Sequence, residues 1–363
     1  MPALPALVED PHSLRLLDGG AEAFPRMLAA ITGARQSVHL EVYTFRLDAT
    51  GRRFLDALLS ALRRGVAVSV VIDGWGSNCS SLAIARAVRL AGGEVRIYHG
   101  LAAFLRGRLV RNHRKVLLVD DEVAFIGGLN IADEYGPHAR GAPWLDLELE
   151  IRGPACASLG RRLRGEHELQ GGGSVRIHLS GPGGGRKLSK RYLKAFGRAR
   201  RRILLAQAYF LPDRHLIRSL TAAARRGVEV RLLLSGRSDI PLIRAATARL
   251  YRRLLRAGVH VHEWQRSVFH VKAGAVDGTR LLVGSFNLDP LSLINLESLV
   301  EADDPVAARQ LESWIDSQLA LAPEVRLRKS RGLPTWARAI LGRMLVALGF
   351  WIPRAFGWLR RPS

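Results

Sequence analysis

The chain has 363 residues, 48% of them hydrophobic, and carries 55 Lys and Arg against 32 Asp and Glu, a formal net charge of +23. This length is enough for a buried core and two or three domains, and a charge of this sign favours polyanionic partners, either nucleic acid or an anionic membrane surface. Two cysteines, Cys79 and Cys156, are too few for a disulfide framework. The start of the chain has no secretory signal and no apolar run is long enough for a transmembrane helix, so we expect a cytoplasmic or peripheral protein.

In chain order, the patterns of the first half return in the second. β-type runs at 34–45 and 199–210 are each followed by an amphipathic helix that ends at a glycine, Gly65 or Gly227, and then by a further strand. Alternating strands and helices predict an α/β fold with a mixed or mostly parallel sheet. We expect two tandem sandwich-like α/β domains with pseudo-two-fold symmetry and one active site at their interface.

Composition divides the chain into four parts. We predict an N-terminal domain over 1–168, a Gly-rich linker over 169–186, a C-terminal domain over 187–325 and a basic aromatic tail over 326–363. The glycines at 183–185 lack the Lys-Ser/Thr arrangement of a phosphate loop, so they are interpreted as linker.

Each half contains one copy of the pattern H-x-K-x-x-x-x-D, at 113–120 and 270–277, followed at equal distance by a Gly-rich turn ending in Asn. In an extended chain, His and Lys two residues apart lie on one face, and a cation beside an imidazole suits a bound phosphate. One neutral imidazole can attack phosphorus while the other, protonated, supplies a proton to the leaving oxygen. Lysine and asparagine side chains can carry the phosphate charge, so this chemistry requires no metal and no other cofactor.

The duplicated motif resembles the phospholipase D superfamily, and the segments around it at 144–146, 151–154, 284–292 and 295–297 resemble its bacterial cardiolipin synthase branch. The resemblance extends from about residue 18 to about residue 319. It implies that His113 is the nucleophile and His270 the general acid and later the base. It also implies that Asp146 and Glu297 orient the imidazoles. The absence of transmembrane segments at the start resembles the shorter, peripheral members of this branch.

The candidate site residues form three groups. The catalytic motifs comprise His113, Lys115, Asp120, His270, Lys272 and Asp277, of which the two aspartates are expected to support local structure. Asn130, Asn287 and Ser285 are candidates for binding the substrate phosphate, and Asp146 and Glu297 for orienting the histidines. Glu41 is a one-sided candidate for a polar residue of the site, because its counterpart is Ala206; the remaining histidines show no metal-ligand spacing.

The favoured function is a phosphatidyltransferase that joins two phosphatidylglycerol molecules into cardiolipin and glycerol. Its partners would be phospholipid and the anionic membrane surface, at the cytoplasmic face of the membrane. Hydrolysis to phosphatidic acid, nucleic-acid cleavage and a non-catalytic binding role stay open as alternatives. The sequence does not determine the oligomeric state.

Two further segments are candidates for lipid contact. The tail at 326–363 interleaves Trp and Arg with apolar residues, as in an element that lies in the headgroup region, although it could equally pack on the protein core or a dimer interface. Residues 101–108 combine apolar side chains with arginines that could guide an acyl chain and a phosphate, or form an ordinary loop.

Overall fold

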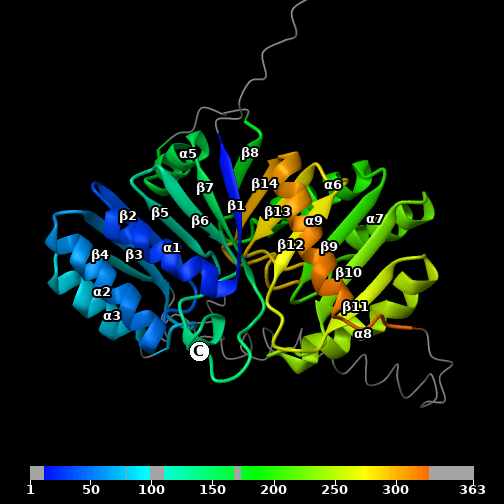
Figure 1. The fold of residues 1–363 in the computed structure, drawn as a ribbon, viewed down its shortest axis with the longest axis horizontal. Helices are drawn as coiled ribbons and strands as arrows, with labels where there is room; N and C mark the ends of the chain where they lie inside the picture. Colours follow the sequence, from blue (N-terminus) through cyan, green and yellow to red (C-terminus); the bar gives the residue numbers. More distant parts are fainter. Residues whose placement is uncertain (1–11, 79, 99–109, 167–172, 327–363) are drawn as a thin grey trace, which may run out of the picture.

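Two mixed β-sheets lie face to face at the centre of the computed structural model (Figure 1), which describes residues 12–78, 80–98, 110–166 and 173–326. The first sheet has the spatial order β1 (Ser13–Asp18), β7 (Leu147–Arg152), β6 (Val123–Gly127), β5 (Val116–Val119), β2 (Ser37–Val42), β3 (Ala67–Asp73) and β4 (Glu94–Tyr98). The second has the order β8 (Val175–Leu179), β14 (Ser298–Asp303), β13 (Arg280–Gly284), β12 (Lys272–Val276), β9 (Arg202–Gln207), β10 (Glu229–Ser235) and β11 (His260–Trp264).

The two sheets have the same topology, which confirms the internal repeat. β2, β3 and β4 are parallel to one another, as are β9, β10 and β11, whereas β5 and β12 each pair antiparallel with the first strand of those sets. The sheets are therefore mixed, as predicted.

Helices cover the outer face of each sheet. The first sheet carries α1 (Gly19–Gly33), α2 (Ala49–Arg63) and α3 (Ser80–Leu90), and the second carries α6 (Gly185–Arg198), α7 (Arg214–Arg225) and α8 (Pro241–Arg256). Two further helices, α5 (Pro154–Leu163) and α9 (Pro305–Ala320), and a short 3-10 helix, η1 (Asp133–Tyr135), complete the elements of the described residues. Gly65 and Gly227, which follow α2 and α7, have φ of +83° and +89°, a left-handed conformation that glycine adopts at little cost.

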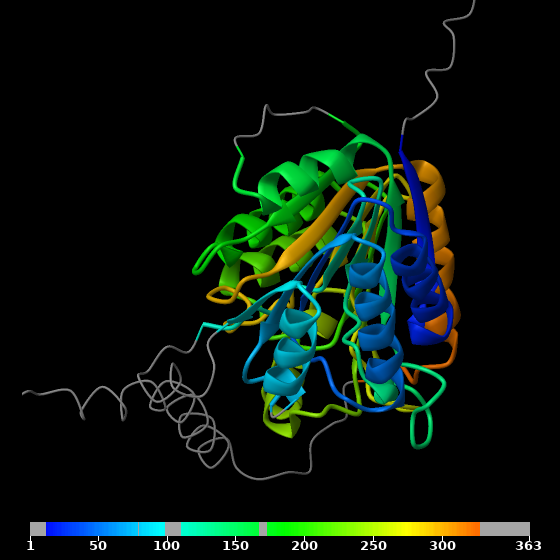
Figure 2. The ribbon, with the colours of Figure 1, turned by 90° about the vertical axis from the view of Figure 1, so that its left-hand side faces the viewer.

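The sheets are buried on both faces, so the molecule has three cores. In β5, Val116 and Leu118 belong to the central core shared by the two sheets, whereas Leu117 and Val119 pack under α1 and α2 in an outer core. A second outer core lies under α6, α7 and α8. The resulting order of layers, helices–sheet–sheet–helices, brings β6 against β13 and β14 and confirms two α/β domains. Figure 2 shows the molecule from the side of the first domain, with its blue and cyan helices in front.

The segment assigned to the linker, 169–186, is partly regular. β8 lies within it and pairs antiparallel with β14, because Val175 and Ile177 are buried in the central core. Four parts that the sequence analysis singled out lie outside the described residues: 169–172 of the linker, Cys79, the 101–108 segment and nearly all of the tail.

Cys156, by contrast, is buried and its thiol donates to the carbonyl of Ile151 at 3.2 Å, which confirms a small packing residue. Among the helices that the structure describes, none combines the length and apolar character needed to cross a bilayer.

Candidate active site

The two histidine motifs meet where the two domains face each other. The sequence pattern placed both histidines in an extended strand. In the structure they lie in the segments that lead into β5 and β12, just before the strands begin. The reason is a crossed backbone pairing: the N–H of His113 donates to the carbonyl of Leu296 at 2.9 Å, and that of His270 to the carbonyl of Leu145 at 2.8 Å. Each motif is therefore held by the opposite domain at the histidine.

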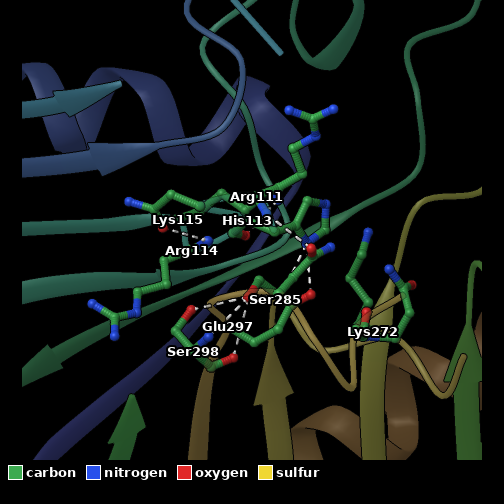
Figure 3. A network of polar contacts seen from close by, with 12 residues as sticks. Arg111, His113, Arg114, Lys115, Lys272, Ser285, Glu297 and Ser298 are labelled. Carbon is green, nitrogen blue, oxygen red and sulfur yellow. Dashed lines mark hydrogen bonds and ion pairs between the residues drawn. The ribbon is translucent and has the colours of Figure 1, made fainter. Parts of the chain in front are cut away.

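His113 is oriented by a carboxylate of the second domain. Its Nδ1 lies 3.0 Å from Oε2 of Glu297, a fully buried side chain that comes just before β14 (Figure 3). The hydroxyl of Ser285 donates to the same carboxylate and accepts the backbone N–H of Ser298 at 2.9 Å. In the structure the Ser285 hydroxyl holds Glu297, and the role in phosphate binding expected from the sequence stays a prediction.

His270 has the reciprocal arrangement. Its Nδ1 lies 2.6 Å from Oδ2 of Asp146, a buried side chain of the first domain. Gly128 occupies the position that corresponds to Ser285, and a Cβ there would lie 2.1 Å from Oδ1 of Asp146. The aspartate is shorter than Glu297 and fills the space that a side chain at residue 128 would need.

A carboxylate at Nδ1 sets the chemistry of both imidazoles. A carboxylate that is ionised and accepts the Nδ1 hydrogen leaves Nε2 unprotonated and more basic. Burial, followed by the charges of Lys115 and Lys272, holds the pKa of His113 well below its usual range. Burial and then Lys272 also lower the pKa of His270. The His113 imidazole is consequently neutral at neutral pH, and a neutral imidazole is able to act as a nucleophile.

The two lysines bring positive charge into the same buried region. Lys115 Nζ donates to the carbonyl of His113 at 2.8 Å, and Lys272 Nζ lies 2.7 Å from Nδ1 of His270 and also bonds the carbonyl of that residue. Burial lowers the pKa of Lys115 to about 7 and that of Lys272 to about 8. Both ammonium groups would gain strongly from an anion, because a buried charge without a counter-charge is costly.

The motif aspartates lie away from this centre. Asp120 and Asp277 follow the far ends of β5 and β12, with φ of +55° and +57°. Each carboxylate accepts three consecutive backbone N–H groups, of residues 35–37 for Asp120 and 200–202 for Asp277, at 2.8 to 2.9 Å. They tie the start of the β2 and β9 strands to the motif strands, which agrees with the expected supporting role.

The side-chain amides of the two asparagines differ in the hydrogen bonds that they make. Asn130 accepts the N–H of Thr44 at 3.0 Å and donates to the Tyr135 hydroxyl at 2.8 Å. Asn287 is buried, and its Oδ1 has no hydrogen-bond partner among the described residues. Asn130 thus supports the chain around the site.

Glu41 supports the first motif from behind. It is buried and contacts Arg114 at 3.3 Å, Asn112 at 3.3 Å and His39 at 3.4 Å. Burial raises the pKa of Glu41, but the three partners outweigh it and the resulting pKa is about 2. Since Asn112 and Arg114 flank His113, this carboxylate holds the backbone of the motif.

Four aromatic residues around the histidines were not identified from the sequence. Tyr43 meets the ring of His113 with centroids 5.1 Å apart, and Tyr135, Trp144 and Tyr209 surround His270 at 5.5, 5.7 and 6.3 Å. Tyr43 directly follows β2, and Tyr209 lies two residues after the end of β9. Both are therefore at the carboxyl ends of parallel strands. Ligand sites of α/β sheets form at such ends, so this position was the signal that could have revealed them.

Comparison with known proteins connects this geometry to one family. A family model described as "Cardiolipin synthase, PLD-like domain" matches residues 27–135 and 192–319, one segment in each half of the chain. Cardiolipin synthase B of Salmonella typhimurium is 34% identical over 318 residues, covering 79% of this chain and 75% of the relative. Cardiolipin synthase B of Escherichia coli is 33% identical over 317 residues, covering 81% and 77%.

Solved structures support the fold. Phosphatidylserine synthase from Haemophilus influenzae superposes with a TM-score of 0.75 over 94% of both chains, at 14% identity. Polyphosphate kinase from Porphyromonas gingivalis superposes with a TM-score of 0.59 over 95% of this chain and 54% of its own, at 17% identity. At these identities the likeness concerns the fold alone.

Proposed function

This chain belongs to the cardiolipin synthase family of phospholipase D-like phosphatidyltransferases, and we propose that it joins two phosphatidylglycerol molecules into cardiolipin and glycerol. The reaction would pass through a phosphatidyl group bound covalently to His113. The observation that carries the proposal is the reciprocal pairing of His113 with Glu297 and of His270 with Asp146. It would provide one neutral nucleophile and one acid–base group, each with a lysine of its own motif beside it.

In the first half-reaction, Nε2 of His113 attacks the phosphorus of the donor lipid. The bond from phosphorus to the headgroup oxygen breaks, and His270 gives a proton to that oxygen, so that glycerol leaves. Because burial lowers the pKa of His270, this step requires that the negative charge of the bound phosphate favour the protonated ring. Lys115 and Lys272 stabilise the negative charge on the remaining phosphate oxygens. Both products of this step are accounted for, because the phosphatidyl group stays on His113.

In the second half-reaction, a hydroxyl of the acceptor lipid attacks the same phosphorus. His270, now neutral, accepts the hydroxyl proton, and the bond between phosphorus and His113 breaks to release cardiolipin. Water in place of the acceptor would give phosphatidic acid, so transfer requires that the lipid hydroxyl be positioned better than water.

We also propose a peripheral position at the cytoplasmic face of an anionic membrane, because a net charge of +23 is attracted to such a surface. The division into domains at 1–168, 169–186, 187–325 and 326–363 stays a proposal, with β8 belonging to the second sheet. Co-sedimentation of the protein with phosphatidylglycerol vesicles, compared with a form that ends at Arg326, tests whether the tail contributes.

The decisive experiment is mass spectrometry of lipids after purified protein is incubated with phosphatidylglycerol vesicles, beside a His113→Ala control. Cardiolipin and glycerol from the wild type alone would support the proposal. Phosphatidic acid as the only product would replace it with a hydrolase. Unchanged lipid, together with cleavage of added DNA or RNA, would move the protein to the nucleic-acid phosphodiesterases of the superfamily.

The covalent step needs its own measurement. Acid quenching during turnover, followed by peptide mass spectrometry, should locate a phosphatidyl adduct on the peptide that contains His113. An adduct on the His270 peptide would reverse the two histidine roles.

A further inference from the structure

An acidic side chain, Asp239, contacts an aromatic neighbour of His270 and has no part in the steps above. Asp239 follows β10, and both of its carboxylate oxygens lie 2.7 Å from the hydroxyl of Tyr209. The Tyr209 ring in turn meets the ring of His270 edge-on, with centroids 6.3 Å apart and planes at 87°. The Asp239 segment is joined to the motif because the carbonyl of Arg237 accepts the N–H of Phe269 at 3.4 Å.

The charge of Asp239 acts on groups of both domains. Burial is the main cause that raises the pKa of Tyr43 and Tyr135, which belong to the first domain, and the charge of Asp239 adds to it. Burial lowers the pKa of Lys272, and Asp239 together with Asp146 opposes this. Asp239 is exposed as a residue, whereas these three groups surround the histidines. The carboxylate therefore lies at the border of the site that the two domains share.

The position that corresponds to Asp239 in the first repeat holds a serine. In the alignment of the repeats that matches Gly65 with Gly227, Asp239 corresponds to Ser77. The Ser77 hydroxyl donates to the Tyr43 carbonyl at 3.0 Å and accepts the Phe45 N–H at 2.9 Å, so it is used within the backbone. A carboxylate bonded to the tyrosine hydroxyl is thus described only for Tyr209, the tyrosine near the histidine that handles the alcohol.

We propose that Asp239, held by Tyr209, forms a subsite that accepts hydrogen bonds from the hydroxyl groups of a polyol headgroup next to His270. A carboxylate has about four acceptor positions on two oxygens, and Tyr209 donates only one hydrogen to them, so room remains for hydroxyl donors. The same charge repels phosphate, which is thereby directed to Lys115 and Lys272. This inference rests on the proposed function and adds the chemical class of the alcohol.

One subsite serves both half-reactions. The leaving glycerol and the attacking glycerol headgroup occupy equivalent positions, because the second half-reaction is the reverse of the first with a different alcohol. One hydroxyl exchanges its proton with His270, and a neighbouring hydroxyl bonds Asp239. A monohydric alcohol or water lacks the second contact, which gives diols an advantage at the phosphatidyl–histidine stage.

The test is a competition between two soluble acceptors. Protein and phosphatidylglycerol vesicles are incubated with equal concentrations of 1,2-propanediol and 1-propanol, and mass spectrometry gives the ratio of the two phosphatidyl alcohols. Both arise from the same intermediate, so the ratio is independent of how fast that intermediate forms. We expect the wild type to prefer the diol and Asp239→Asn to lower the ratio about tenfold, as for loss of one hydrogen bond to a charged group.

Two further variants complete the experiment. Tyr209→Phe should lower the ratio by a smaller factor, because Asp239 loses its hydrogen bond to the Tyr209 hydroxyl but keeps its charge. If Asp239→Asn does not fold, Tyr209→Phe tests the subsite in its place. Asp56→Asn, an equal charge change at an exposed position of α2, should leave the ratio unchanged. An undiminished diol preference in both site variants, or none in the wild type, would overturn this inference. Absence of transfer to either alcohol in the wild type would instead overturn the proposed function.

Discussion

Nδ1 of His113 lies 3.0 Å from Oε2 of Glu297, a residue 184 positions further along the chain and in the other domain. His270 and Asp146 repeat this contact in the opposite direction at 2.6 Å, across 124 positions. For the two motif histidines, neither domain contains both the imidazole and its carboxylate. The active centre therefore exists only when the two halves are docked, and docking is coupled to the orientation of both catalytic rings.

Removing either orienting carboxylate should reduce turnover without unfolding the protein. Glu297→Gln and Asp146→Asn each replace an acceptor at Nδ1 by an amide that can favour the wrong tautomer, an effect that costs about 10⁴-fold in kcat in a serine protease triad. We expect losses of about 10²- to 10⁴-fold in cardiolipin formation. Activity within a few fold of wild type in either variant would remove that carboxylate from the mechanism.

Ser285→Ala should shift the pH dependence of kcat/KM and leave the fold intact. Burial raises the pKa of Glu297 to about 8, while Lys115 and Ser285 act against this increase. Without the serine hydroxyl the pKa of Glu297 should rise further, and the acid limb of kcat/KM should move to higher pH. An unchanged acid limb with lowered kcat would mean that Ser285 acts in some other way.

Gly128 should not tolerate even an alanine. A Cβ at this position would lie 2.1 Å from a carboxylate oxygen of Asp146, which is fixed in turn by His270. We expect Gly128→Ala to lower stability by about 1–3 kcal/mol through overpacking and to displace the carboxylate, with a large loss of activity. Gly197→Ala is the matched control: nothing lies within 4 Å of its added Cβ, and it should be neutral or stabilising in α6. Urea denaturation and lipid product analysis measure both effects.

Much of this organisation could be predicted because it is local or duplicated. The β-type runs of the two halves became β2 and β9, and the glycines after α2 and α7 have the left-handed backbone expected of a helix end. The paired motifs were found by their spacing, and the predicted interface is where they meet.

The remaining features depend on tertiary contacts. Residues 113 and 270 read as strand because their neighbours alternate, yet both leave their sheets to pair with the opposite domain. The Ser285 hydroxyl donates to the carboxylate of Glu297, a contact that the spacing of the sequence does not reveal. Asp239 lies in a segment without a motif, and only the fold brings it next to Tyr209.

The charge state of the centre predicts a narrow pH optimum. Lys115 and Lys272 must be protonated to hold phosphate, so activity should fall as pH rises through their pKa values of about 7 and about 8. Glu297 must be ionised to orient His113, so activity should also fall as pH decreases through its pKa of about 8. We expect a bell-shaped kcat/KM with a maximum between about pH 7 and 8. A flat profile from pH 6 to 9.5 would contradict these assignments.

Chelation should leave the reaction unaffected, because the two lysines supply the positive charge that a metal provides in other phosphoryl transfers. The measurement is cardiolipin formation with and without excess EDTA, after prior dialysis against the chelator. Loss of activity that is restored by a divalent metal would contradict this mechanism.

Asp277→Asn should lower stability while sparing catalysis. The carboxylate accepts three backbone N–H groups at φ of +57°, and asparagine keeps that backbone conformation but replaces one acceptor oxygen by an N–H donor. One or more N–H groups then lose their partner, at a cost of about 1–3 kcal/mol.

The pH dependence of that loss has a definite sign. Burial raises the pKa of Asp277, but the backbone hydrogen bonds outweigh it, so the folded-state pKa lies below the ordinary 3.8. The contribution is therefore present above the unfolded-state pKa and is lost as pH falls through the folded-state value. The difference in urea midpoint between wild type and Asp277→Asn should shrink on acidification, and Asp120→Asn should behave alike because its carboxylate has the same three contacts. Loss of kcat at pH 7 with an unchanged midpoint would instead place these aspartates in the chemistry.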